Sequence, residues 1–83
     1  MMIDTKKLEE LISKGNELSA ACEVRSSIGD FITVNIERCK RERNYLELQA
    51  WAEALDKTVA ELAVLTDELR AVNEQIQQMR RDP

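Results

Sequence analysis

The sequence predicts an all-α protein in which an N-terminal helix packs as a helical hairpin on a long C-terminal helix, and this long helix forms a coiled coil or bundle with other copies. The chain of 83 residues contains only two glycines and one proline, so few residues interrupt helices. A row of apolar residues also recurs at a seven-residue step, which keeps it on one side of a helix that must be buried against another helix. This row consists of Leu48, Leu55, Leu62, Leu69 and Ile76.

The first helix is expected over residues 6–24, after a cap at Asp4 or Thr5. Gly15 interrupts its apolar pattern without changing the phase. The glycine either ends a short helix as a C-terminal cap or lies inside one continuous helix at a close helix crossing. We favour the continuous helix because one apolar face persists on both sides of Gly15. That face contains Leu8, Leu11, Ile12, Leu18 and Cys22.

A turn is expected at residues 25–30, which contain Gly29 and the possible helix caps Ser27 and Asp30. Residues 31–36 are rich in β-branched side chains and could form a strand. A lone strand would have no partner strand, however, and a helical stripe runs through the same segment. We therefore expect one helix over residues 31–80, with residues 6–24 folded back along residues 30–46. The stripe consists of Ile28, Ile32, Ile36 and Cys39.

The seam of the long helix spans residues 48–79. With the leucine row at heptad position a, position d is also mostly apolar. Because the first helix is expected to be far shorter than this seam, we predict that the chain associates with itself as a dimer or tetramer. The alternative is that the whole seam packs against the chain's own N-terminal helix. The predicted oligomer interface comprises Leu48, Trp51, Leu55, Leu62, Leu65, Leu69, Val72, Ile76 and Met79.

The net charge of −4 provides no overall attraction to nucleic acid, but residues 38–43 carry a local charge of +3. This cluster is either a solvated helix face or a docking patch for an acidic protein or a phosphate backbone. Binding of phosphate by so few cations would be weak and sensitive to salt. A basic-zipper protein is disfavoured, because residues 28–36 are hydrophobic and Glu53 occupies the position of the first zipper leucine. The possible docking patch comprises Arg38, Lys40, Arg41 and Arg43.

The sequence offers no catalytic, cofactor-binding or metal-binding residues. It contains no histidine, no glycine-rich phosphate loop and no metal-ligand spacing, so we predict no enzyme, no cofactor and no metal site. Cys22 and Cys39 are expected to be buried apolar residues, since a zinc site needs about four ligands. Without an apolar run of about 20 residues or a signal-peptide stretch, we expect no membrane association and a cytoplasmic location.

Residues 3–12 (IDTKKLEELI) and residues 60–69 (AELAVLTDEL) resemble the short helical accessory proteins encoded in the early regions of lambda-like phages and prophages. The resemblance implies a capped N-terminal helix, a C-terminal coiled coil, and a bacterial cytoplasmic protein that binds a host or phage protein. The chain is thus predicted to be one domain, residues 1–83, that works as a non-enzymatic homo-oligomeric interaction module: a scaffold, an adaptor or an inhibitor of one protein partner. The alternative is a small nucleic-acid-associated regulator that uses residues 38–43.

Overall fold

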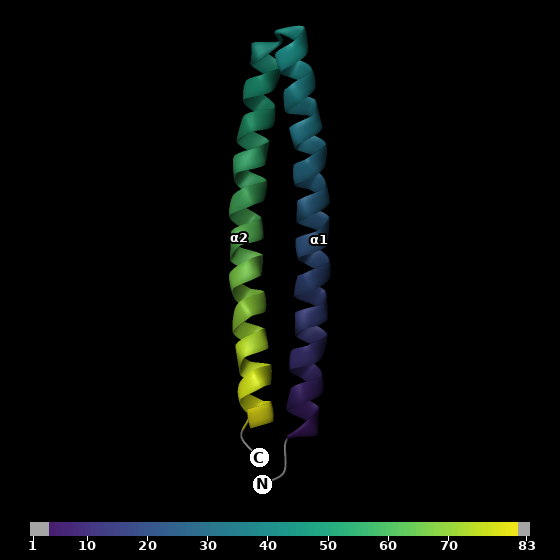
Figure 1. Ribbon diagram of the computed structural model, residues 1–83, viewed down its shortest axis with the longest axis vertical. Coiled ribbons are helices and arrows are strands. Elements are labelled where there is room, and N and C mark those ends of the chain that lie inside the picture. The colour runs from purple at the N-terminus through teal and green to yellow at the C-terminus, as the bar shows by residue number, and fades with distance from the viewer. Residues whose placement is uncertain (1–3, 82–83) are drawn as a thin grey trace.

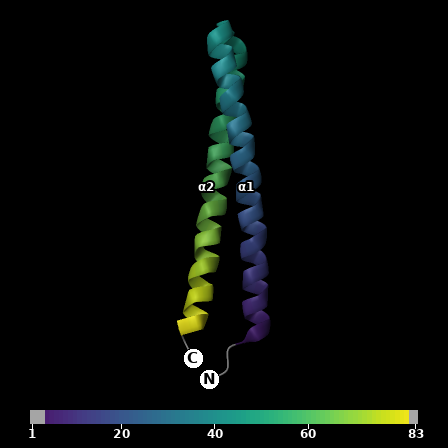
Figure 2. The ribbon, with the colours of Figure 1, turned by 45° about the vertical axis from the view of Figure 1, so that its right-hand side comes forward.

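The computed structural model describes residues 4–81, which form two long helices, α1 (Thr5–Glu42) and α2 (Tyr45–Arg81). The helices run antiparallel as a hairpin 64 Å long, with the start of α1 and the end of α2 at one end and the connecting turn at the other (Figure 1). A view turned by 45° shows the two helices overlapping near the turn and lying side by side toward the opposite end (Figure 2). The predicted all-α hairpin is confirmed, and residues 31–36 are helical.

Helix α1 begins where the sequence indicated. The side chain of Asp4 accepts a hydrogen bond from the backbone N–H of Lys7 at 3.2 Å, which satisfies one of the free donors of the first turn. The helix passes through Gly15 without interruption, so the favoured continuous reading of this segment is confirmed.

The predicted turn at residues 25–30 is wrong, because the whole segment lies inside α1. Ser26, Ser27 and Gly29 are weak helix formers, but their disadvantage of up to about 1 kcal/mol each is outweighed by tertiary packing on both sides. The expected helix over residues 6–24 and the start of the long helix at residue 31 are therefore also wrong. Residues 6–24 cannot fold back along residues 30–46, since both belong to one helix.

The chain reverses direction at Arg43 and Asn44. Arg43 has φ 57° and ψ 33°, the left-handed conformation that commonly ends helices, and the N–H of Asn44 donates to the carbonyl of Cys39 at 3.0 Å. Asn44 then caps α2, because its Oδ1 accepts from the backbone N–H of Glu47 at 3.3 Å. An N-cap residue followed three positions later by glutamate is a sequence signal for a helix start. This signal was missed because Asn44 and Glu47 lie inside residues 31–80, which were expected to form one uninterrupted helix.

The seam of α2 packs against α1 of the same chain. Helix α1 has 38 residues and α2 has 37, so the expectation that the first helix is too short to cover the seam is wrong. Both helices carry an unbroken heptad row, and every member is buried or half-buried. The nine residues predicted as an oligomer interface thus line an interface within the chain. The row of α1 is Leu8, Leu11, Gly15, Leu18, Cys22, Arg25, Gly29, Ile32, Ile36 and Cys39.

Candidate functional site

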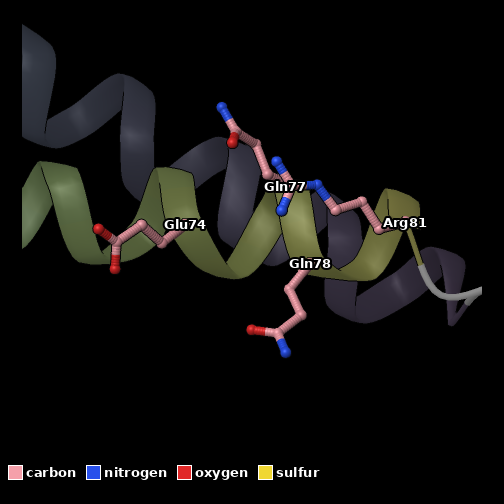
Figure 3. A pocket seen from close by; sticks show the side chains of 4 residues that line it. All are labelled: Glu74, Gln77, Gln78 and Arg81. Carbon is pink, nitrogen blue, oxygen red and sulfur yellow. The ribbon is translucent and has the colours of Figure 1, made fainter.

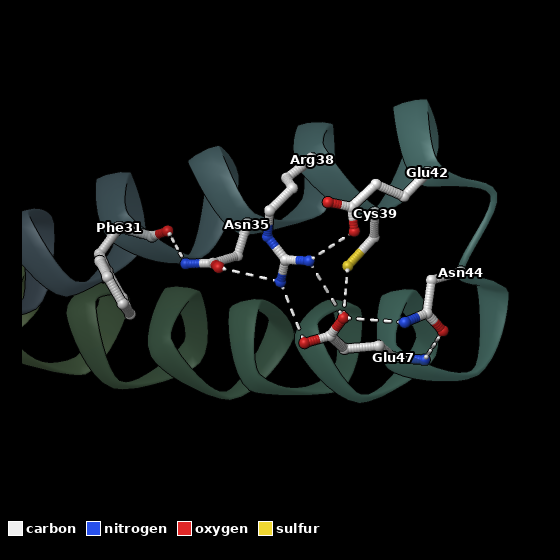
Figure 4. A network of polar contacts seen from close by, with 7 residues as sticks. All are labelled: Phe31, Asn35, Arg38, Cys39, Glu42, Asn44 and Glu47. Carbon is white, nitrogen blue, oxygen red and sulfur yellow. Dashed lines mark hydrogen bonds and ion pairs between the residues drawn. The ribbon is translucent and has the colours of Figure 1, made fainter.

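A polar network ties the end of α1 to the start of α2 (Figure 4). The guanidinium of Arg38 donates to Glu42 Oε2 and to Glu47 Oε1, each at 3.0 Å. Glu47 lies in the first turn of α2 and also accepts from Asn44 Nδ2 at 3.0 Å and from the thiol of Cys39 at 3.4 Å. One carboxylate therefore joins both helices and the turn between them.

The network shifts the ionisation of its members. The hydrogen bond from Arg38 lowers the pKa of Glu47 below its usual range, since the donor favours the charged carboxylate. Burial raises the pKa of the Cys39 thiol, and the hydrogen bond to Glu47 raises it further. The bond to Glu47 likewise raises the pKa of Arg38. At neutral pH the carboxylate is charged and the thiol is neutral, which matches the direction of the hydrogen bonds.

The predicted docking patch is divided by this network. Arg38 is engaged with two carboxylates, and the Lys40 ammonium lies 3.6 Å from Glu37. Arg41 and Arg43 are exposed and form no ion pair with any residue between 4 and 81. The sequence identified all four cations but gave no indication that one of them is neutralised by a residue nine positions away.

The end of the hairpin at the Arg43–Asn44 turn, which we call the tip, also exposes two apolar residues that the sequence did not point to. Leu46 is 86% exposed and Tyr45 is 64% exposed, directly after the turn. They lie within three residues of Arg43, so the tip combines apolar and cationic side chains. Neither residue belongs to the heptad row that α2 buries against α1.

A second exposed apolar surface lies midway along the hairpin, and we call it the apolar face. It comprises Val24, Ile28 and Phe31 of α1 and Val64 of α2, whose exposed fractions range from 38% to 62%. The ring of Phe31 meets that of Trp51 edge to face, with centroids 5.7 Å apart, which connects the face to the seam. The sequence reasoning did not identify this surface, because it assigned residues 25–30 to a turn.

An ion pair crosses the seam within the apolar face. Arg25 occupies a heptad position of α1, and its Nε lies 2.7 Å from Glu61 Oε2 of α2. The Nε–H does not point at this oxygen, so Nε is a buried donor without a hydrogen bond among the described residues. Both side chains are about two-fifths exposed, and they line a shallow hollow together with Val64 and Leu65.

Two other hollows on the described surface are poor ligand sites. One, of about 370 Å³, is lined by four polar side chains from a single face of α2, Glu74, Gln77, Gln78 and Arg81 (Figure 3). Another lies on the opposite flank, beside Val59 and Thr66. Ligand pockets are usually enclosed and lined from several elements, and neither hollow has that form.

Both cysteines are free thiols. Cys39 is fully buried, as expected, whereas Cys22 is only half-buried. Among residues 4–81 no three carboxylate or thiol side chains are grouped so as to hold a metal ion. Neither α1 nor α2 has a stretch long and apolar enough to cross a bilayer.

Comparison with protein-family models, curated proteins and solved structures finds no match for this chain.

Proposed function

We propose that this protein is a non-enzymatic, homo-oligomeric interaction module of the bacterial cytoplasm that acts as a scaffold, adaptor or inhibitor of one protein partner. The observation that carries the proposal is the apolar face, with Val24, Phe31 and Val64 each more than half exposed. Contiguous exposed apolar surface is typical of interaction sites. A phage or prophage origin belongs to the same proposal and rests on the resemblance of residues 3–12 and 60–69.

The thin core of the hairpin supports assembly. Among residues 4–81 only four apolar residues, Leu18, Ile32, Cys39 and Val72, are less than 9% exposed, and the leucines in the heptad row of α2 are half-buried. A chain of this size buries little surface by itself, and small proteins commonly gain stability by oligomerisation. Residues 4–81 form one pair of helices, and no other element within this range covers the apolar face, so another chain would bury it.

Sedimentation equilibrium of the full chain at micromolar concentration tests the proposal. We expect a mass of at least twice 9.5 kDa, since the apolar face favours association. A mass of 9.5 kDa across the micromolar range would overturn the homo-oligomeric function.

The alternative proposal, a nucleic-acid-associated regulator, has weaker support. Arg41 and Arg43 are the remaining free cations of the cluster among the described residues, and the chain carries a net charge of −4. Two phosphate contacts contribute little affinity at physiological salt. We expect no measurable binding of double-stranded DNA or RNA there, and a sub-micromolar complex in a fluorescence titration would favour the alternative.

A further inference from the structure

We propose that the apolar face is covered by the same face of a second copy, and that the two hairpins lie parallel with their turns at the same end. Helix α1 of each copy then packs against α2 of the other, which gives a four-helix bundle. This inference rests on the proposed homo-oligomeric function and specifies its interface and its geometry.

The shape of the molecule suits a second copy. A two-fold symmetric interface uses the same patch on both chains, so the patch must be able to cover itself. The flank of the hairpin is 64 Å long and 14 Å wide. Its projected area is therefore similar in size to the roughly 800 Å² of surface that each partner buries in a standard interface. The apolar face lies near the middle of this flank, so two copies can overlap over most of their length.

The remaining exposed apolar residues do not form a comparable surface. Ile12 lies near the open end of the hairpin, Tyr45 and Leu46 lie at the turn, and Val34 lies on the outer side of α1. Val59 is exposed on the opposite flank, where α1 contributes no large exposed apolar residue at the same level. Their heptad positions place them off the apolar face. Isolated exposed apolar residues are common on monomers, whereas a cluster from two helices is not.

The ion pairs decide the orientation. Arg25 and Glu61 lie at the same level along the long axis of the hairpin, which we call height. Arg38 and Glu47 also share one height, nearer the turn. A two-fold axis along the hairpin places α1 opposite α2 of the second copy at equal height. Each Arg25 then faces Glu61 of the second copy, and each Arg38 faces Glu47 of the second copy.

The opposite orientation brings like charges together. A two-fold axis across the hairpin places α1 on α1 and α2 on α2, with their heights reversed. Overlap of the two apolar faces then brings the two Arg25 side chains toward each other, and likewise the two Glu61 side chains. Like charges at a partly desolvated interface are destabilising, so the parallel arrangement is favoured. The parallel arrangement also places Val24 against Val64 of the second copy, so that two apolar side chains cover each other.

The interface is tested with the full chain by sedimentation equilibrium and circular dichroism. In Val24→Lys/Ile28→Lys, two charges enter the apolar face, and we expect the mass to fall to 9.5 kDa with helicity retained. The matched control, Val34→Lys/Leu46→Lys, changes two exposed apolar residues off the face and should keep the wild-type mass. Should the double variant lose its helicity, the single variant Phe31→Lys, at a position 62% exposed, provides the same test.

The outcomes separate the two proposals. A monomeric wild type overturns the proposed function and this interface together. If the wild type is oligomeric and Val24→Lys/Ile28→Lys keeps the oligomeric mass, only the proposed interface is overturned. The same conclusion follows if the control Val34→Lys/Leu46→Lys dissociates as fully as the face variant. Loss of the oligomer in the face variants alone supports both.

The orientation is tested by distance measurement at the turn. A nitroxide attached to Arg41→Cys, in a chain with Cys22→Ala and Cys39→Ala and with wild-type mass, reports the separation of the two tips by pulsed dipolar spectroscopy. We expect a distance below about 35 Å, because neighbouring helices in a bundle lie roughly 10 Å apart. In the opposite arrangement the axis crosses the apolar face, about 20 Å along α1 from Arg41, so labels separated by roughly 40 Å or more would overturn the parallel arrangement.

Discussion

Gly15 of α1 lies against Val72 of α2, where a Cβ added to the glycine would stand 3.6 Å from Val72 Cγ1. That distance is an ordinary van der Waals contact. At Gly29, further along the same heptad row, an added Cβ would meet no heavy atom within 4 Å. Neither glycine has a positive φ, so neither backbone conformation requires glycine. Both positions therefore have room for alanine.

We predict that Gly15→Ala and Gly29→Ala each raise the free energy of unfolding by about 0.5–1 kcal/mol, because alanine is the stronger helix former. Urea denaturation monitored by circular dichroism measures the change. Gly15→Leu serves as the control, because its larger side chain would collide with α2 and should destabilise by about 1–3 kcal/mol. A loss of stability in Gly15→Ala would show that the helices need glycine at this contact.

The turn gives a second prediction. Arg43→Gly should stabilise the hairpin by about 1 kcal/mol, because an L-residue in the left-handed conformation is strained by roughly 1–2 kcal/mol. Asn44→Ala should destabilise it by about 0.5–2 kcal/mol through loss of the cap of α2. Thermal melts of both variants, with Arg43→Ala as the control for lost charge, measure these effects. Equal melting of Arg43→Gly and Arg43→Ala would contradict the role of the backbone conformation.

The Arg38–Glu47 pair predicts how stability depends on pH. The pKa of Glu47 is lower in the folded chain than in the unfolded chain, so its contribution is present above about pH 4.3 and is lost as pH falls through the folded value. Glu47→Gln should therefore be less stable than wild type at pH 7, and this difference should shrink toward pH 3. Chemical denaturation at several pH values checks it. Glu37→Gln, whose pair with Lys40 is exposed, should show a much smaller difference at every pH.

The two thiols should react at different rates. Cys39 is fully buried and its pKa is raised, whereas Cys22 is half-buried on the seam. In native protein at pH 8, we expect a thiol reagent such as a chromogenic disulfide to modify Cys39 roughly tenfold or more slowly than Cys22, because modification of Cys39 requires the hairpin to open. Cys22→Ala should remove the fast phase and Cys39→Ala the slow one. A fast phase that survives Cys22→Ala would show that the tip opens readily.

Only part of the candidate site could be predicted. The cations of residues 38–43 were visible in the sequence, but their partners depend on which helix turn faces them, and Glu47 reaches Arg38 only because the chain reverses at Arg43. The apolar face was not predicted, because its members come from two helices and are brought together by the hairpin. Val24 and Val64 are 40 residues apart, and no local pattern links them.

The sequence by itself determined that the chain is helical and that α2 must bury a row of apolar residues. A seven-residue step and scarce glycine and proline suffice for both conclusions, since each depends on local geometry. It also contained the matching row of α1, although Gly15, Arg25 and Gly29 occupy three of its positions and hid the pattern.

Only the tertiary structure decided what covers that row. A heptad row specifies that a helix face must be buried, but it does not specify whether the cover comes from the same chain or from another. The answer depended on the turn at Arg43 and Asn44, where the left-handed backbone and the cap from Asn44 end one helix and begin the next. Because the turn lies at the middle of the chain, α1 and α2 are nearly equal in length, and each covers the seam of the other.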